Sequence, residues 1–183
     1  MTEQDITDLI AQDEWMMDVL KTARSLSLPD WMIGAGFVRN KVWDYLHGYA
    51  TKTKTASDID LIYFDTANVD EDKDRLLSEE LKRKTGMEWE VVNQAYTHKW
   101  HDRELPYEDT VSALAEWVET PTCVAVRLEE DDTLTLFAPH GIDDLVNLVV
   151  RPSPSFENDL DKFWERVKGK GWEAKWPKLR VIA

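Results

Sequence analysis

Residues 33–40 read IGAGFVRN and residues 57–64 read SDIDLIYF, and these two stretches decide which fold the chain adopts. In the first stretch an apolar residue leads into two glycines. This is typical of a strand that turns sharply into a helix, because glycine tolerates backbone conformations that other residues avoid. The second stretch begins with polar residues and continues as an apolar run, which predicts a strand. Together they predict a strand–turn–helix unit followed by another strand.

Two aspartates one residue apart, Asp58 and Asp60, open the second strand. Side chains alternate between the faces of a strand, so these two carboxylates point the same way while Ile59 and Leu61 face the core. Parallel carboxylates repel each other unless a cation lies between them. Mg²⁺ suits such a pair, since it prefers hard oxygen ligands and binds substrate phosphates at the same time. By itself, however, the pattern is more often a strand that begins with two solvated aspartates.

The glycine turn makes a phosphate site the better interpretation. Gly34 and Gly36 let the backbone approach a ligand closely. The apolar spacing of Phe37, Val42 and Leu46 predicts a helix after the turn, and the N–H groups that begin a helix favour a phosphate. The third glycine of the dinucleotide-binding fingerprint is missing, and so is its acidic residue. We therefore expect the turn to bind phosphate together with the aspartate pair.

These motifs resemble the core of the polymerase-β-like nucleotidyltransferase superfamily, and in particular its small bacterial nucleotidyltransferase-like proteins. The resemblance extends over about residues 30–150, and it rests on residues 34–40, 47–48, 57–61, 93–100, 138–145 and 150–152. Residues 35–40 are also similar to the Gly-Gly-x-Val-Arg-Asp run of tRNA CCA-adding enzymes. They differ from it at Ala35 and Asn40, where that run has glycine and aspartate.

The resemblance implies an α/β (α+β) fold: a twisted mixed sheet flanked by helices, with a C-terminal hairpin and further helices. It implies Mg²⁺-dependent transfer of a nucleoside monophosphate from an NTP to an acceptor hydroxyl. It also implies a third carboxylate on a neighbouring strand, for which Glu90 is the candidate and Glu88, on the same face, the alternative. A second possibility is a catalytically silent member of this fold that binds a nucleotide or a protein partner.

The resemblance assigns roles to individual residues. Asp58, Asp60 and Glu90 form the catalytic and metal-binding set. The backbone of the glycine turn holds the β- and γ-phosphates, and Arg39 or Lys54 neutralises the charge of the leaving group. The implied nucleotide-binding residues are Gly34, Ala35, Gly36, Arg39, Asn40, Lys54 and Ser57.

Length and composition indicate an ordinary globular protein. The 183 residues predict a single domain over residues 1–183. No apolar run approaches the roughly 20 residues of a membrane span, and residues 1–5 lack the features of a signal peptide. The single cysteine, Cys123, excludes an intrachain disulfide and fits a reducing compartment, so we expect a cytoplasmic protein.

The formal net charge of −14 argues against a polynucleotide substrate. Proteins that grip a phosphate backbone generally present basic patches, because the release of counterions drives that binding. Three basic runs exist, around Lys52 and Lys54, over residues 82–84 and over residues 162–178. We expect the first to contact a triphosphate and the other two to be solvated helix faces.

The periodicity of apolar residues predicts the remaining elements. The expected helices cover residues 4–26 (as one or two), 36–47, 70–85, 107–118, 142–150 and 156–167. The expected strands cover residues 31–33, 57–64, 87–93, 122–128 and 133–137. Gly169, Gly171 and Pro177 predict an irregular tail. No motif encodes the base of the NTP, the acceptor or the oligomeric state.

Overall fold

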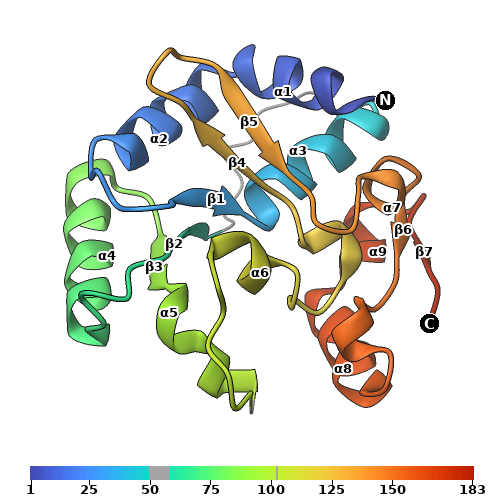
Figure 1. Ribbon diagram of the computed structural model, residues 1–183. Coiled ribbons are helices and arrows are strands. Elements are labelled where there is room, and N and C mark those ends of the chain that lie inside the picture. The colour runs from blue at the N-terminus through green and yellow to red at the C-terminus, as the bar shows by residue number, and fades with distance from the viewer. Residues whose placement is uncertain (50–57, 102) are drawn as a thin grey trace.

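The computed structural model describes residues 1–49, 58–101 and 103–183, so the predicted site residues Lys54 and Ser57 lie outside the described part. A five-stranded mixed sheet organises the molecule in the order β3-β2-β1-β4-β5 (Figure 1). Its strands are β1 Met32–Gly34, β2 Ile59–Tyr63, β3 Trp89–Asn93, β4 Ala125–Leu128 and β5 Leu134–Phe137. The β2–β3 pair is parallel, whereas β1 pairs antiparallel with both β2 and β4, and β4 with β5. The predicted mixed sheet and C-terminal hairpin are therefore confirmed.

Four longer helices build the main layer: α1 Glu3–Ala11, α2 Glu14–Arg24, α3 Gly36–Leu46 and α4 Glu71–Thr85. Their ends follow from the sequence. Asp13 accepts a hydrogen bond from the N–H of Met16 and caps α2. Asp70 caps the start of α4, and Gly86, with φ of 72°, ends it in the left-handed conformation that glycine adopts without strain. The predicted start and end of this helix are confirmed.

The side chains of the strands alternate between the two faces of the sheet, and one face is covered by far more packed residues than the other. One face packs against α1 to α4 through strand residues that include Ile33, Leu61, Val91 and Val126. The other face forms a small cluster of Met32, Ile62, Ala125 and Leu114. Leu114 belongs to the short helix α6, Thr110–Leu114. The second face is thinly covered, and its β2–β3 part is left to line a cavity.

Four predicted elements differ from the structure. The helix expected over residues 107–118 is only the α6 turn, because the chain then turns back to place Trp117 against Gly34 of β1. The helix expected over residues 142–150 is α7, Asp143–Val146. Leu148 then adopts a positive φ of 58°, and the next two residues form β6, Val149–Val150.

The third and fourth differences lie in the C-terminal region. The helix expected over residues 156–167 is α8, Leu160–Lys170, which begins after the cap residue Asp159 and follows a 3₁₀ turn over Pro154–Phe156. The expected irregular tail contains α9, Trp172–Lys175, and β7, Arg180–Val181. β7 pairs parallel with β6 in a second, two-stranded sheet. Further short elements are α5 Gln94–Thr97, η1 His98–His101 and η2 Thr120–Thr122.

The C-terminal segment is fixed to α3 by aromatic contacts and hydrogen bonds. The ring of Trp43 meets Trp172 and Trp176 edge to face, at centroid distances of 5.6 and 5.1 Å. The indole N–H of Trp176 donates to Asp44 over 2.8 Å. Trp43, Trp172 and Trp176 are all buried, which makes this contact part of the main core. It places α8 and α9 beside the glycine turn.

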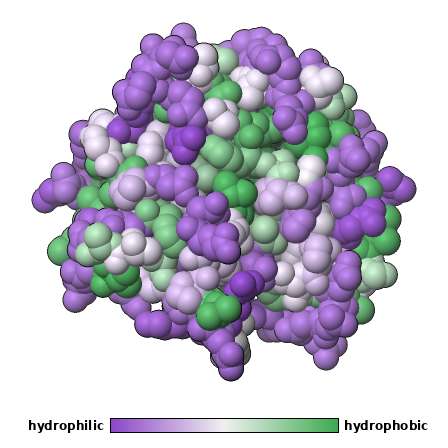
Figure 2. All heavy atoms as spheres, viewed as in Figure 1, coloured by the Kyte–Doolittle hydropathy of each residue, from purple (hydrophilic) through white to green (hydrophobic). Residues whose placement is uncertain are grey.

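The outer surface matches the composition. On the face seen in Figure 1, hydrophilic side chains surround smaller hydrophobic patches (Figure 2). Among the described residues, no helix is both long and apolar enough to cross a membrane.

Candidate active site

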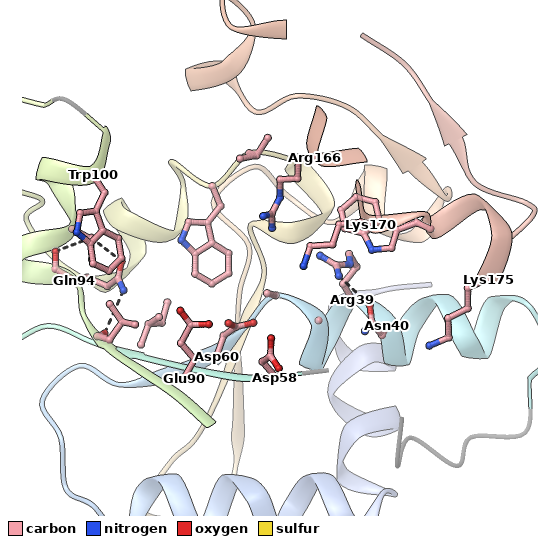
Figure 3. Close-up of a pocket in the computed structure, with 18 of the residues that line it drawn as sticks. Arg39, Asn40, Asp58, Asp60, Glu90, Gln94, Trp100, Arg166, Lys170 and Lys175 are labelled. Carbon is pink, nitrogen blue, oxygen red and sulfur yellow. Dashed lines mark hydrogen bonds between the residues drawn. The ribbon is translucent and has the colours of Figure 1, made fainter. Parts of the chain in front are cut away.

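A cavity of about 530 Å³ opens on the thinly covered face of the sheet. Its floor comes from β2 and β3, one wall from the start of α3, and another from α8 and α9. Figure 3 shows three acidic side chains at its centre, basic side chains on one side of them, and Gln94 and Trp100 on the other.

The three predicted carboxylates all line this cavity. Asp60 and Glu90 are direct register partners in the parallel β2–β3 pair, where neighbouring strands lie about 4.8 Å apart. Asp58 directly precedes β2 and faces the same side as Asp60. The alternative candidate Glu88 lies at the surface instead, where its carboxylate pairs with Lys82 at 2.7 Å.

The surroundings of Asp60 raise its proton affinity. The pKa of the Asp60 carboxyl is raised to about 7, first by burial and then by the negative charge of Glu90, while Arg39 opposes the rise. Its carboxylate receives no hydrogen bond from the described residues. In the described part of the chain Asp60 forms no ion pair either, and Arg39 and Lys170 lower its pKa less than burial and Glu90 raise it.

The chemistry of this donor set fits a divalent cation. All three groups offer hard carboxylate oxygens, which Mg²⁺ prefers, and a cation beside Asp60 would supply the missing counter-charge. The set is nevertheless open: in residues 1–49, 58–101 and 103–183, no three His, Cys, Asp or Glu side chains come close enough together to hold a metal ion. Water or phosphate oxygens would have to complete the coordination, as is usual for Mg²⁺.

The glycine turn contributes the next wall. Ala35, Gly36 and Asn40 line the cavity, and α3 starts without a side-chain cap. Ala35 has φ of 50° and ψ of −122°, a conformation that favours glycine. Gly34 does not line the cavity. A Cβ atom at that position would come within 2.8 Å of the Trp117 ring, so the glycine at position 34 is explained by packing.

Arg39 is held rigidly at the edge of the cavity. It is only 5% exposed, and its guanidinium lies 4.5 Å from the centre of the Trp172 ring. One of its terminal nitrogens donates to the Thr122 hydroxyl over 2.7 Å and the other to the side chain of Asn40 over 3.2 Å. Burial lowers its pKa to about 10, with Glu119 opposing, so the group still carries its charge at neutral pH. A fixed cation of this kind suits an anionic ligand.

Three further basic side chains join Arg39 to form the basic wall of the cavity, and their position there was not predicted. Arg166, Lys170 and Lys175 line the cavity. Lys170 and Lys175 are exposed on helices, as the sequence predicted for residues 162–178, whereas Arg166 is half-buried; the prediction did not place any of the three at the cavity. The Nε of Arg166 donates over 2.7 Å to Glu119, which is completely buried. The docking of Trp172 on α3 places the basic side chains of α8 and α9 at the cavity. No local pattern in the sequence reveals that long-range contact.

The far end of the cavity carries no cation among its described residues. It is lined by Ile62, Val92, Gln94, Thr97, Trp100 and Trp117. The block containing Gln94 and Trp100 contributed to the resemblance, but nothing in the sequence assigned those residues to the cavity. The cavity thus divides into a basic end and an uncharged end, with the carboxylates between them (Figure 3).

Comparison with protein families gives one clear match. Residues 21–181 match the model of a family described as nucleotidyltransferase. No curated protein is similar enough in sequence to count as a match.

Solved structures share this fold. One is an NMR structure described as a CCA-adding enzyme head domain. It is 30% identical, with a TM-score of 0.89 over 99% of this chain and 96% of that chain. A CCA-adding enzyme in complex with CTP is 17% identical, with a TM-score of 0.59 over 97% of this chain and 43% of that chain.

The Thermotoga maritima CCA-adding enzyme complexed with tRNA is also 17% identical, with a TM-score of 0.59 over 97% of this chain and 42% of that chain. This chain therefore spans almost the whole of the first structure but less than half of the two longer ones.

Proposed function

Because this chain belongs to the nucleotidyltransferase family, we propose that it transfers a nucleoside monophosphate from an NTP to the hydroxyl group of an acceptor. The observation that carries the proposal is the cavity in which Asp58, Asp60 and Glu90 lie beside the basic wall. A triphosphate needs cationic partners and, in metal-dependent transfer, carboxylates that hold the metal. Both kinds of group line the same cavity.

Each part of the cavity has a role in this proposal. The N–H groups at the start of α3, with Ala35, Gly36 and Asn40, bind phosphate oxygens. Arg39 and the cations of α8 and α9 neutralise the remaining charge of the triphosphate. Lys54 and Ser57 keep their predicted part in nucleotide binding.

Asp58, Asp60 and Glu90 would hold Mg²⁺. When bound, the metal supplies charge stabilisation for the attacking and leaving oxygens. Glu90 is the member of the set that we assign to draw the proton from the acceptor hydroxyl, and its side chain is more exposed to the cavity than that of Asp60.

The related structures support an NTP as the donor. CCA-adding enzymes of this fold have been solved with CTP and with ATP. At 17% identity these two structures support the fold and do not fix the base that this chain uses. The donor is therefore proposed as an NTP without a choice of base.

The direct test is calorimetric titration of the protein with ATP, CTP, GTP and UTP, with Mg²⁺ and with EDTA. We expect at least one NTP to bind only with Mg²⁺, and the Asp58→Asn/Asp60→Asn variant to lose at least 100-fold in affinity. Asp18→Asn is the matched control, because Asp18 is exposed on α2, away from the cavity. NTP binding that ignores both Mg²⁺ and the double substitution would overturn the metal-dependent mechanism.

A second candidate function is a nucleotide- or protein-binding module without catalysis. The open arrangement of the carboxylates favours it, because no closed metal-binding group exists among the described residues. The two candidates differ in turnover. Release of pyrophosphate from a bound NTP in the presence of an acceptor supports the enzyme, whereas tight NTP binding without any release supports the module.

A further inference from the structure

The two ends of the cavity differ in charge, and this difference constrains the acceptor. The four cations that line the cavity in the described part of the chain are Arg39, Arg166, Lys170 and Lys175. All four come from α3, α8 and α9 and lie on one side of the carboxylates (Figure 3). The lining from β2, β3, α5 and η1 contains carboxylates and uncharged side chains only.

The uncharged end has the features of a site for a ring. Trp100 is 56% exposed, although a free indole gains by leaving water. Its ring is held by an edge-to-face contact with the buried Tyr96, at a centroid distance of 5.5 Å and an interplanar angle of 71°. An exposed aromatic ring that already contacts a buried ring offers a stacking surface, and its two side-chain torsions limit the entropy lost when a ligand binds.

The polar side chains of Gln94 and Thr97 line the cavity at the same end as Trp100. Gln94 is 4% exposed; its amide nitrogen donates to the carbonyl of Val92 and its amide oxygen accepts from the Thr97 hydroxyl. The amide is thereby oriented, and one of its two N–H groups has no partner among the described residues. An oriented amide N–H is a suitable donor to a hydroxyl oxygen of a bound ligand.

A polyanion fits this end poorly. Phosphodiester groups would have to lie against Glu90 and Asp60, with no cation from the described lining to compensate them. Binding of a nucleic acid backbone depends on such cations, and like charges in a concave site repel the ligand. The chain as a whole, with a net charge of −14, increases the repulsion.

We infer that the acceptor is a small ring-shaped alcohol without negative charge, of which a glycoside is the simplest example, and that it stacks on Trp100 rather than being the end of a nucleic acid. This inference rests on the proposed function, since it assigns the acceptor class of the same cavity. In the transfer step the acceptor hydroxyl oxygen forms a bond to the α-phosphorus of the NTP. The bond from that phosphorus to the β-phosphate oxygen breaks, pyrophosphate leaves, and the hydroxyl proton passes to Glu90.

The test follows the indole N–H signals of ¹⁵N-labelled protein by NMR, with the Trp100 signal assigned by its loss in Trp100→Phe. Phenyl β-D-glucoside is the neutral probe and phenyl β-D-glucoside 6-phosphate its negatively charged counterpart. An RNA hairpin with a single-stranded CC-3′ end represents the nucleic acid. Each is titrated into protein with Mg²⁺ and a non-transferable NTP analogue, and into protein without them.

We expect the glucoside to move the Trp100 signal, the 6-phosphate to bind at least tenfold more weakly, and the RNA to leave the signal unchanged. Trp100→Ala should lose at least tenfold in glucoside affinity but keep its affinity for the NTP analogue. Trp164→Ala is the matched control, because Trp164 is 46% exposed on α8 and does not line the cavity.

Two results would overturn the inference: a Trp100 signal that does not move at 10 mM glucoside in either titration, or an RNA hairpin that moves it at a lower concentration than the glucoside does. The proposed function is tested separately in the same samples by the Mg²⁺-dependent effect of the NTP analogue on the Arg39 and Arg166 Nε signals. If the analogue has an effect and the glucoside has none, only the acceptor class is wrong. If the analogue has none, the proposed function fails.

Discussion

Asp74 and Asp60 are two carboxylates near the same pair of strands, and their surroundings are opposite. Asp74, on α4, is 3% exposed and accepts three hydrogen bonds. Two come from the hydroxyls of Tyr63 and Tyr96 at 2.6 and 2.8 Å, and one from the backbone N–H of Asn93 at 2.7 Å. Asp60, on β2, faces other carboxylates in the cavity, and its pKa is raised to about 7.

The same two strands therefore hold one carboxylate that stabilises the fold and another that is available to a ligand. Tyr63 and Asn93 are register partners at the ends of β2 and β3, so the Asp74 cluster (Asp74, Tyr63, Tyr96 and Asn93) ties these ends to α4. Asp60 and Glu90 are register partners nearer the starts of the same strands. A buried carboxylate with its donors satisfied stabilises the fold, whereas one without donors retains its capacity to bind a ligand.

The largest effect on stability is expected for Asp74→Ala. The substitution leaves three donors without an acceptor, so we expect a loss of about 4 kcal/mol in the free energy of unfolding. Chemical denaturation measures it. Asp72→Ala is the control, since Asp72 lies exposed on the same helix and its carboxylate pairs with Arg75 at the surface, and it should lose less than about 0.5 kcal/mol by the usual limit for surface substitutions. A loss below about 1 kcal/mol for Asp74→Ala would remove the distinction between the two carboxylates.

Asp60→Asn should increase the free energy of unfolding at neutral pH, whereas Asp74→Ala lowers it. The folded protein holds a proton on Asp60 up to about pH 7, whereas the model value for a free aspartate is 3.8. The folded state therefore binds more protons than the unfolded state between these pH values, and stability without metal falls as the pH rises from 4 to 7.

Thermal denaturation in EDTA from pH 5 to pH 8 tests this expectation. The Asp60→Asn variant should show little of the fall and should exceed the wild type at pH 8 by about 2 kcal/mol. Asp18→Asn should retain the wild-type profile. Equal pH profiles of wild type and Asp60→Asn would show that Asp60 is not the uncompensated charge.

Tyr96→Phe tests the Asp74 cluster through one of its donors. Removing a single hydrogen bond to a charged acceptor should cost about 1.5 kcal/mol, and in Asp74→Ala the same change should cost much less because its partner is already gone. The double-mutant cycle by urea denaturation gives the coupling energy. Tyr45→Phe, at a side chain that is 56% exposed, is the control. Additive losses would mean that the Tyr96 hydroxyl contributes independently of Asp74.

The smallest change in stability is expected for Ala35→Gly, which relieves backbone strain at the edge of the cavity. Ala35 has φ of 50°, which an L side chain adopts only at a cost. Ala35→Gly relieves this strain but adds flexibility to the unfolded chain, so we expect a net gain of about 0.5–1 kcal/mol. Ala11→Gly, at the end of a regular helix, should instead lose a few tenths of a kcal/mol. Destabilisation by Ala35→Gly would mean that the alanine contributes packing that outweighs its strain.

Local patterns predicted much of this molecule. The spacing of Asp58 and Asp60, the glycine turn, and the cap residues of α4 are signals within a few residues, and the structure forms the predicted strand, helix start and helix ends there. The resemblance implied a third carboxylate on a neighbouring strand, with Glu90 as the candidate, and the register places Glu90 beside Asp60. Whether these residues act in catalysis remains a prediction for the experiments above.

The basic wall and the uncharged end could not be predicted in this way. Arg166 reaches the cavity only because Trp172 and Trp176 dock on Trp43, a contact between segments far apart in the sequence. Periodicity reports which face of a helix is apolar and carries no information about the element that it meets. The helix expected over residues 107–118 is shorter than predicted for a related reason, since the return of Trp117 to Gly34 ends α6 earlier than its apolar pattern suggests.

The docking of the C-terminal segment also sets the order in which the cavity is completed during protein synthesis. The five-stranded sheet is complete once Phe137 has been added, and it brings the carboxylates and Arg39 with it. Arg166, Lys170 and Lys175 follow later, and at about 5–20 residues per second they arrive after a delay of seconds. A nascent chain thus carries the acidic part of its cavity before Arg166, Lys170 and Lys175, so the proposed NTP binding is expected only after Trp172 and Trp176 have docked.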